Sequence, residues 1–161
     1  MRNTNDRQQI LPPEGGAMGG HGRWVAALGR APLARLTLVG LGLDVVDLMG
    51  LVRHCPGLRE LDIRQYSVSL AALPCLAALP HLRRLRAMVP SDPAAIFPHC
   101  QEAATAALLL LLLPAPALEA VELGTPWEEP QFDGVFERVG AELEARGGGR
   151  RLERSVGRPN D

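Results

Sequence analysis

Residues 58–63 read Leu58-Arg59-Glu60-Leu61-Asp62-Ile63, a pattern with apolar residues at its first, fourth and sixth positions. From Leu61 onward apolar and polar residues alternate, which is typical of a β-strand with one buried face. Cys55-Pro56-Gly57 stands directly before the stretch, and a proline there ends a preceding helix. The pattern therefore predicts a short strand that begins just after a helix has stopped.

The same pattern recurs three more times. The related segments are 33–38, 82–87 and 118–123, and each follows a proline by one or two residues. Successive segments begin 25, 24 and 36 residues apart, so the last interval carries an insertion. One unit of this length cannot bury its apolar face alone, whereas stacked units make a continuous core. We therefore expect these segments and 58–63 to be neighbouring parallel strands of an α/β protein.

The intervals between the segments have the apolar spacing of helices. Leu48 and Leu51 lie 15 and 18 residues after the first leucine of their unit, and Leu73 and Leu76 repeat those offsets. Residues spaced in this way share one face of a helix. Each unit is thus predicted to consist of a strand, a turn and a helix that stops at a proline.

Two further stretches are expected to be helical. A helix over Gln131–Arg146 would place Phe132, Phe136, Val139 and Leu143 on one face, where they would close the C-terminal end of the core. The run 108–113 consists of six leucines, which cannot all face inward. We expect some of them to be exposed or covered by a partner.

Residues 51–63, LVRHCPGLRELDI, resemble the stretch LaxxCPxLxxLxL of the cysteine-containing leucine-rich repeats found in F-box-type proteins. The resemblance covers about residues 24–143. It departs from the family pattern because Leu79 and Ala115 stand where later units would carry cysteine. The family position after each strand, usually Cys or Asn, holds Leu41, Tyr66, Pro90 and Pro126. Residues Ile10–Glu14 resemble the beginning of an F-box, but the glycine-rich stretch after them is not the helical segment that an F-box needs. We therefore expect no F-box.

The resemblance implies a short curved solenoid, with parallel strands on the concave side and helices outside. It also implies a non-catalytic protein–protein interaction module that binds a partner on the concave face. By resemblance alone, such a module would be a substrate-recognition piece of a ubiquitin-ligase-like assembly. The alternatives are an enzyme or metal-binding module that uses the His and Cys residues, a fragment of a longer repeat protein, and a chain without a settled function.

Length and composition predict one domain. Residues 1–21 and 147–161 are rich in Gly, Pro or charge and are expected to be a disordered N-terminal segment and a flexible tail. The repeats occupy 22–146, with an insertion near 88–102 that is either a contact loop or degenerate repeat. A net charge of −1 gives no general attraction for nucleic acid or anionic membranes. Without a signal peptide or a 20-residue apolar span, we expect a cytoplasmic protein.

Strand alternation defines a candidate partner-binding face. If the leucines of each strand face inward, the polar residues between them face outward. They would form one row of Arg35, Glu60 and Arg84, and a second of Thr37, Asp62, Arg86 and Glu122, with Arg64 beyond them. Charges of opposite sign alternate along both rows. One interpretation is a charged surface for a protein partner; the other is a set of solvated ion pairs across the strands.

The histidines and cysteines are weak candidates for a metal site or a catalytic pair. They are His54, Cys55, Cys75, His81, His99 and Cys100. None has the CxxC or HxxxH spacing of zinc ligands, and adjacent residues such as His54 and Cys55 rarely point at each other. Cys55 has a structural explanation as a small apolar residue under the start of a strand. We therefore expect no metal, no cofactor and no catalytic residue.

Overall fold

The computed structural model describes residues 9–10, 21–64, 68–88, 101–125, 130–147 and 149–156, without the side chains of 9–10, 125, 130–132 and 154–156. Within these residues six strands form one parallel sheet in chain order. They are β1 (Gln9–Ile10), β2 (Arg35–Val39), β3 (Glu60–Arg64), β4 (Arg84–Met88), β5 (Ala120–Thr125) and β6 (Arg151–Val156).

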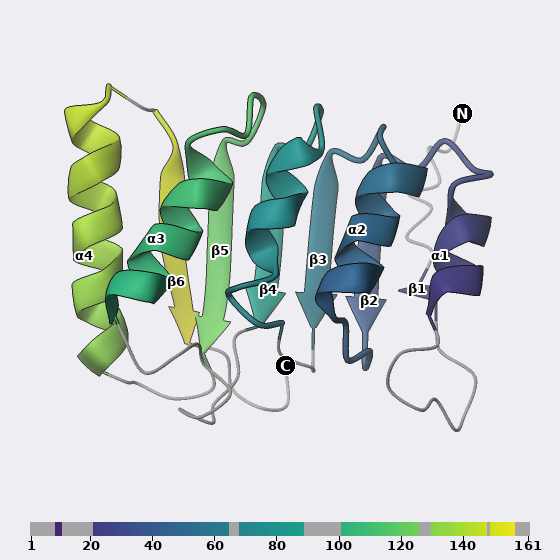
Figure 1. Cartoon of the computed structure of the whole chain (residues 1–161), viewed down its shortest axis with the longest axis horizontal. Coiled ribbons are helices and arrows are strands. Elements are labelled where there is room, and N and C mark those ends of the chain that lie inside the picture. The colour runs from purple at the N-terminus through teal and green to yellow at the C-terminus, as the bar shows by residue number, and fades with distance from the viewer. Residues whose placement is uncertain are drawn as a thin grey trace, which may run out of the picture.

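One helical element lies between each pair of successive strands. These are α1 (Gly22–Leu28), α2 (Val45–His54), the 3₁₀ helix η1 (Leu73–Ala78), α3 (Gln101–Leu112) and α4 (Pro130–Ala145). Parallel crossovers in one sheet share the same hand, so strands placed in chain order send every crossover to the same face. Figure 1 shows the helices in front of the sheet, with α4 beyond β6 at the C-terminal end.

The four expected segments are neighbouring parallel strands, as the repeated pattern predicts. Leu61 is in register with Leu36 on one side and Leu85 on the other. Each strand begins two residues after the first leucine of its segment, since that leucine lies in the turn into the strand. Among these first leucines, Leu58, Leu82 and Leu118 are buried and Leu33 is half-buried.

A repeated backbone contact holds the starts of the strands together. The carbonyl oxygen of Ala34 accepts from the N–H groups of both Arg59 and Glu60, at 2.8 and 3.0 Å. The same arrangement recurs one unit later, where the Arg59 oxygen accepts from Arg83 and Arg84, and again where the Arg83 oxygen accepts from Glu119 and Ala120. The starts of successive strands therefore share one pattern of backbone hydrogen bonds.

The core lies between the sheet and the helices. Its strand side consists of two buried rows, Leu36, Leu61, Leu85 and Val121, then Leu38, Ile63, Ala87 and Leu123. Its helix side includes Leu48, Leu51, Leu73 and Leu76, the residues placed there by their offsets. The residues directly before Pro56, Pro80 and Pro116 are also buried; they are Cys55, Leu79 and Ala115. This confirms the packing role expected of Cys55.

Helix α2 begins at a capping box. The Asp47 N–H donates to Asp44 Oδ1 at 2.9 Å, and the Asp44 N–H donates to Asp47 Oδ2 at 3.3 Å. Together these bonds satisfy backbone donors that the first turn of a helix leaves free. Burial raises the pKa of the Asp47 carboxyl.

The helical element of the next unit is of a different type. Leu73–Ala78 forms a 3₁₀ helix rather than an α-helix. Pro74 lies at its start and lacks a backbone N–H, and Pro80 follows its end closely. The stretch between these prolines is too short for a longer α-helix.

Helix α4 closes the C-terminal end of the core, as its apolar spacing predicts. Val135, Val139 and Leu143 are buried, and Phe136 packs partly buried against the same cluster. Phe132 lies outside the described side chains.

The expected disorder of 1–21 and flexibility of 147–161 are each corrected in part. Gln9 pairs with Thr37, so β1 extends the sheet beyond β2. Strand β6 pairs with β5 along its whole length, from Arg151 opposite Ala120 to Val156 opposite Thr125. An edge strand offers unpaired backbone N–H and C=O groups, so even a short or polar segment pairs with it.

Candidate functional site

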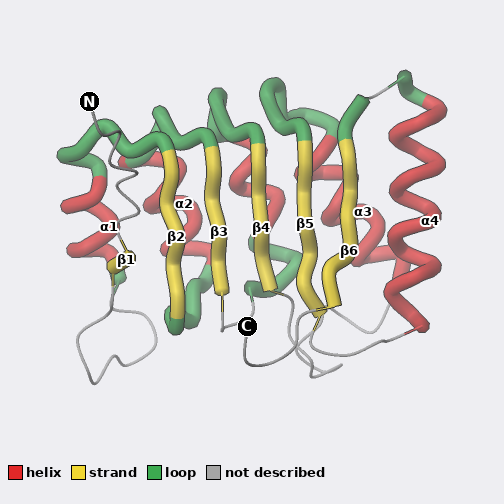
Figure 2. The backbone as a smooth tube through the Cα atoms, turned by 180° about the vertical axis from the view of Figure 1, so that it is seen from behind, coloured by secondary structure: helices red, strands yellow, loops and turns green. Residues whose placement is uncertain are grey.

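The two faces of the sheet differ in what covers them. The helices cover one face, and Figure 2 shows the strands from the other side with the helices behind them. A parallel sheet usually has both faces covered, and its strands are then apolar on both sides. Here buried and exposed or half-buried residues alternate along β2, β3 and β4. We call the side that no described helix covers, formed by the outward residues of β2–β6, the open face.

Register brings the candidate residues together as two rows on the open face. Arg35, Glu60 and Arg84 face one another across β2, β3 and β4. The second row contains Thr37, Asp62, Arg86 and Glu122 in register across β2 to β5. Arg64 lies beyond them, opposite Val39. Arg35, Arg64, Arg84 and Arg86 are exposed, and the other four candidates are partly buried but none is fully buried. The rows expected from strand alternation are therefore present.

Two ion pairs cross neighbouring strands. Arg35 Nε lies 3.2 Å from Glu60 Oε2, and Arg86 Nη2 lies 2.9 Å from Glu122 Oε1. Both pairs are partly exposed, and such pairs contribute only about 0–1 kcal/mol to stability. The ion-pair interpretation is therefore correct for these four residues, while their low contribution leaves the charges available to a partner.

Asp62 pairs along its own strand instead. Arg64 Nε donates to Asp62 Oδ2 at 2.8 Å, and this hydrogen bond raises the pKa of the Arg64 guanidinium. Asp62 Oδ1 is buried and has no hydrogen-bond partner. Because Asp62 pairs with Arg64, Arg86 pairs with Glu122 on β5 and not with Asp62, its neighbour on β3.

The sequence pattern missed the part of the open face that β6 supplies. Arg151 is in register with Ala120 and Glu153 with Glu122, and both side chains are exposed. The stretch GRRLER at 149–154 has only Leu152 where the other segments have two or three apolar residues. That leucine, in register with Val121, is the one signal in the sequence for an additional strand.

Neither described cysteine is arranged for catalysis or metal binding. Cys55 is buried in the core, and Cys75 is half-buried with its thiol directed at the Ala72 carbonyl oxygen, 2.9 Å away. Burial raises the pKa of both thiols, that of Cys75 to about 11, so they stay protonated at neutral pH. No metal-binding group of His, Cys, Asp or Glu occurs among the described residues. His99 and Cys100 lie outside them.

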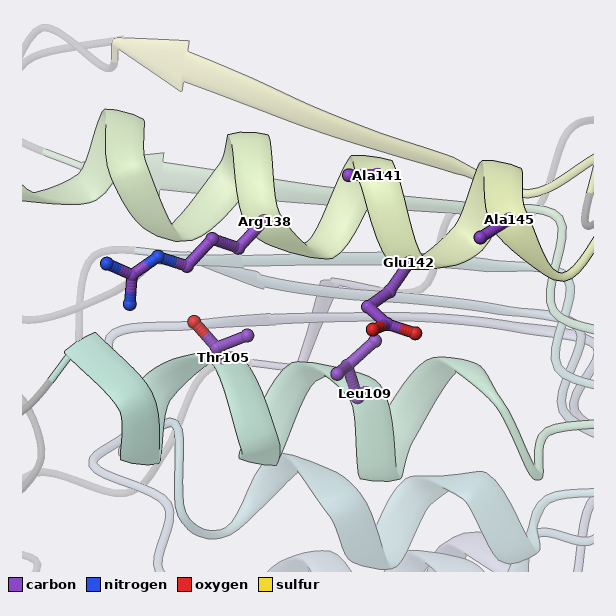
Figure 3. A pocket seen from close by; sticks show the side chains of 6 residues that line it. All are labelled: Thr105, Leu109, Arg138, Ala141, Glu142 and Ala145. Carbon is purple, nitrogen blue, oxygen red and sulfur yellow. The ribbon is translucent and has the colours of Figure 1, made fainter.

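A groove of about 550 Å³ runs between α3 and α4 (Figure 3). It is lined by Thr105, Leu109, Arg138, Ala141, Glu142 and Ala145. Glu142 is also paired with Arg146 one turn away. The lining contains one carboxylate, that of Glu142, and one hydroxyl, that of Thr105, and neither His nor Cys.

Exposed apolar side chains occur on the helical face. Val46 is 70% exposed, Met49 is 58% exposed and Leu110 is 62% exposed, while Val45 is also exposed. The expectation that the leucine run could not be wholly buried is confirmed at Leu110. These residues are the rival surface to the open face. Most of the insertion near 88–102 lies outside the described residues.

No helix among the described residues is long and apolar enough to cross a membrane. Comparison of the chain with models of known protein families gives no match, and no similar curated protein is found.

Proposed function

We propose that the chain is a leucine-rich-repeat solenoid and a non-catalytic protein-interaction module that binds a partner protein on its open face. The observation that carries the proposal is the uncovered side of the parallel sheet, with eight charged or polar candidates projecting from its strands. Concave faces of repeat proteins are extended binding surfaces. The repeated strand–helix units support the family assignment. By resemblance to that family, the module would recognise substrates for a ubiquitin-ligase-like assembly in the cytoplasm.

The polarity of the outward strand residues supports the same surface. A sheet face covered by a second layer would be apolar, so the alternation on these strands suits contact with water or with a polar partner. Paired charges on a partly exposed surface set specificity and association rate more than affinity. Among the described residues no cluster of His, Cys, Asp and Glu could hold a metal ion.

The proposal is tested with charge reversals on the two faces. Arg84→Glu with Arg86→Glu changes the open face, and Arg53→Glu with Arg138→Glu changes exposed arginines of α2 and α4 by the same charge. A partner isolated with the wild-type chain is titrated against both variants at low and high salt. We expect the open-face variant to bind at least about 10-fold more weakly, most clearly at low salt, and the control to bind normally.

Thermal melts by circular dichroism accompany the titrations. Both variants are expected to keep nearly the wild-type melting temperature, because exposed charges contribute little to stability. A partner that binds the open-face variant as tightly as wild type would overturn the proposal. The exposed Val46, Met49 and Leu110 would then define the better surface.

A further inference from the structure

Two arginines on the open face have no ion-pair partner among the residues that the structure describes. Arg84 on β4 and Arg151 on β6 are each in register with Ala120 on β5, so they stand on the same level on either side of it. Both side chains are exposed. Within the described residues neither guanidinium has a carboxylate partner.

Three of the nearby carboxylates are already engaged by other arginines. Glu60, the strand neighbour of Arg84, pairs with Arg35 at 3.2 Å. Glu122, one level further along β5, pairs with Arg86 at 2.9 Å. Glu119, just before Ala120, lies 3.8 Å from Arg83. The two guanidinium groups therefore have no ion-pair partner among the described residues, and Glu153, two residues after Arg151, pairs with neither of them.

Ala120 makes the space between the two arginines accessible. Neighbouring strands lie about 4.8 Å apart, so the backbones of Arg84 and Arg151 are separated by roughly 10 Å. The alanine methyl group puts no long side chain between them. Two arginine side chains of this separation are long enough to bring both guanidinium groups over β5, where one anion would contact both. Guanidinium groups match the planar, two-oxygen geometry of carboxylates.

We infer that Arg84 and Arg151 bind a carboxylate of the partner protein, an Asp or Glu side chain, above Ala120. This inference rests on the proposed function, because it names the chemistry of the partner at one point of the open face. The negative charge of Glu153 lies one level away, about 7 Å along the strand. It disfavours a dianionic phosphate more than a single carboxylate, and it suits a basic residue of the same partner.

The inference is tested on the purified full chain by NMR at low ionic strength. The Nε–Hε signals of the arginines are followed during titration with triglutamate, with trilysine as the control peptide. We expect the Arg84 and Arg151 signals to shift together and to saturate with one dissociation constant. Arg84→Gln and Arg151→Gln should each raise that dissociation constant about 2- to 5-fold, the range for the loss of one exposed ion pair. Arg53→Gln on α2 should leave it unchanged.

Two results would overturn the inference. Shifts that grow linearly and equally at all exposed arginines would indicate general screening instead of a site. Tighter saturable binding of a phosphoserine peptide than of triglutamate would indicate a phosphate site. Both results leave the proposed function intact if the partner still discriminates between the two charge-reversal variants. Saturable triglutamate binding with no such discrimination would leave the carboxylate site intact and remove the proposed function.

Discussion

Arg150 Nη2 donates to the backbone carbonyl oxygen of Ala115 at 2.9 Å, and Nη1 of the same side chain donates to the Leu113 oxygen at 3.3 Å. The last carbonyl groups of a helix have no partner within it, so a cation there is favourable. This contact joins the chain after α4 to the end of α3, beside the first residue of β6.

Arg150→Ala is therefore expected to loosen β6 without unfolding the other strands. Hydrogen bonds to charged groups contribute about 1.5–3 kcal/mol. Hydrogen exchange should show faster exchange of the Arg151 amide, which donates to the Glu119 oxygen, and unchanged exchange across β2–β3. Arg146→Ala, which removes only an exposed pair with Glu142, is the control. Unchanged exchange at Arg151 in Arg150→Ala would show that the contact does not hold β6.

The inward orientation of Leu61 is tested by a charge. Leu61 is 1% exposed between Leu36 and Leu85, so Leu61→Asp would bury an unpaired carboxylate. The cost is several kcal/mol against a total stability of about 5–15 kcal/mol, so the chain is expected to be unfolded at room temperature. Val39→Asp, on the open face opposite Arg64, is the matched control and should melt nearly as wild type. A wild-type melting curve for Leu61→Asp would show that the Leu61 side chain does not face inward.

Two glycine substitutions are expected to act in opposite directions. A Cβ at Gly29 would lie 2.6 Å from the His54 carbonyl oxygen, so Gly29→Ala must push α1 away from the end of α2. We expect a loss of about 1–3 kcal/mol in chemical denaturation. Gly140 lies within α4 with nothing within 4 Å of the added atom, and Gly140→Ala should gain about 0.5–1 kcal/mol from helix propensity. Destabilisation of equal size in both would contradict the close approach of α1 to α2.

The thiols give a prediction for pH. The pKa of Cys75 is raised to about 11, so the folded state keeps this proton after the unfolded state has lost its own near pH 8.5. The contribution of Cys75 to stability is therefore complete below about pH 8.5 and is lost as the pH rises towards 11. Alkylation of Cys75 at pH 8 should be much slower in the folded chain than in urea. Equal rates would show that the thiol is not held in its neutral form.

Removing all three thiols tests the metal alternative. Replacement of Cys55, Cys75 and Cys100 by Ala is expected to leave partner binding largely intact, because no described metal group depends on them. Elemental analysis of the wild-type chain should find no stoichiometric zinc. About one zinc per chain would instead support a metal-binding module.

The sequence predicts the inward residues of the four central strands because alternation and proline spacing agree there. Leu36, Leu61 and Leu85 share one level, which follows from counting along three similar segments. Which charges would pair was not predictable: Asp62 turns to Arg64 on its own strand, and that choice depends on side-chain conformation. Strand β6 was missed because Leu152 stands in the stretch GGGRRLER at 147–154, with four charged residues and three glycines, a composition typical of flexible tails.

The most direct measurement of the central claim is site-specific photo-crosslinking to a bound partner. A photoreactive residue is placed at Thr37 or Ala120 on the open face, and at Val46 or Leu110 on the helical face. All four variants are first shown to melt as wild type. We predict that Thr37 and Ala120 form covalent adducts with the partner and that Val46 and Leu110 do not. Adducts from Val46 and Leu110 alone would contradict the assignment of the open face as the binding surface.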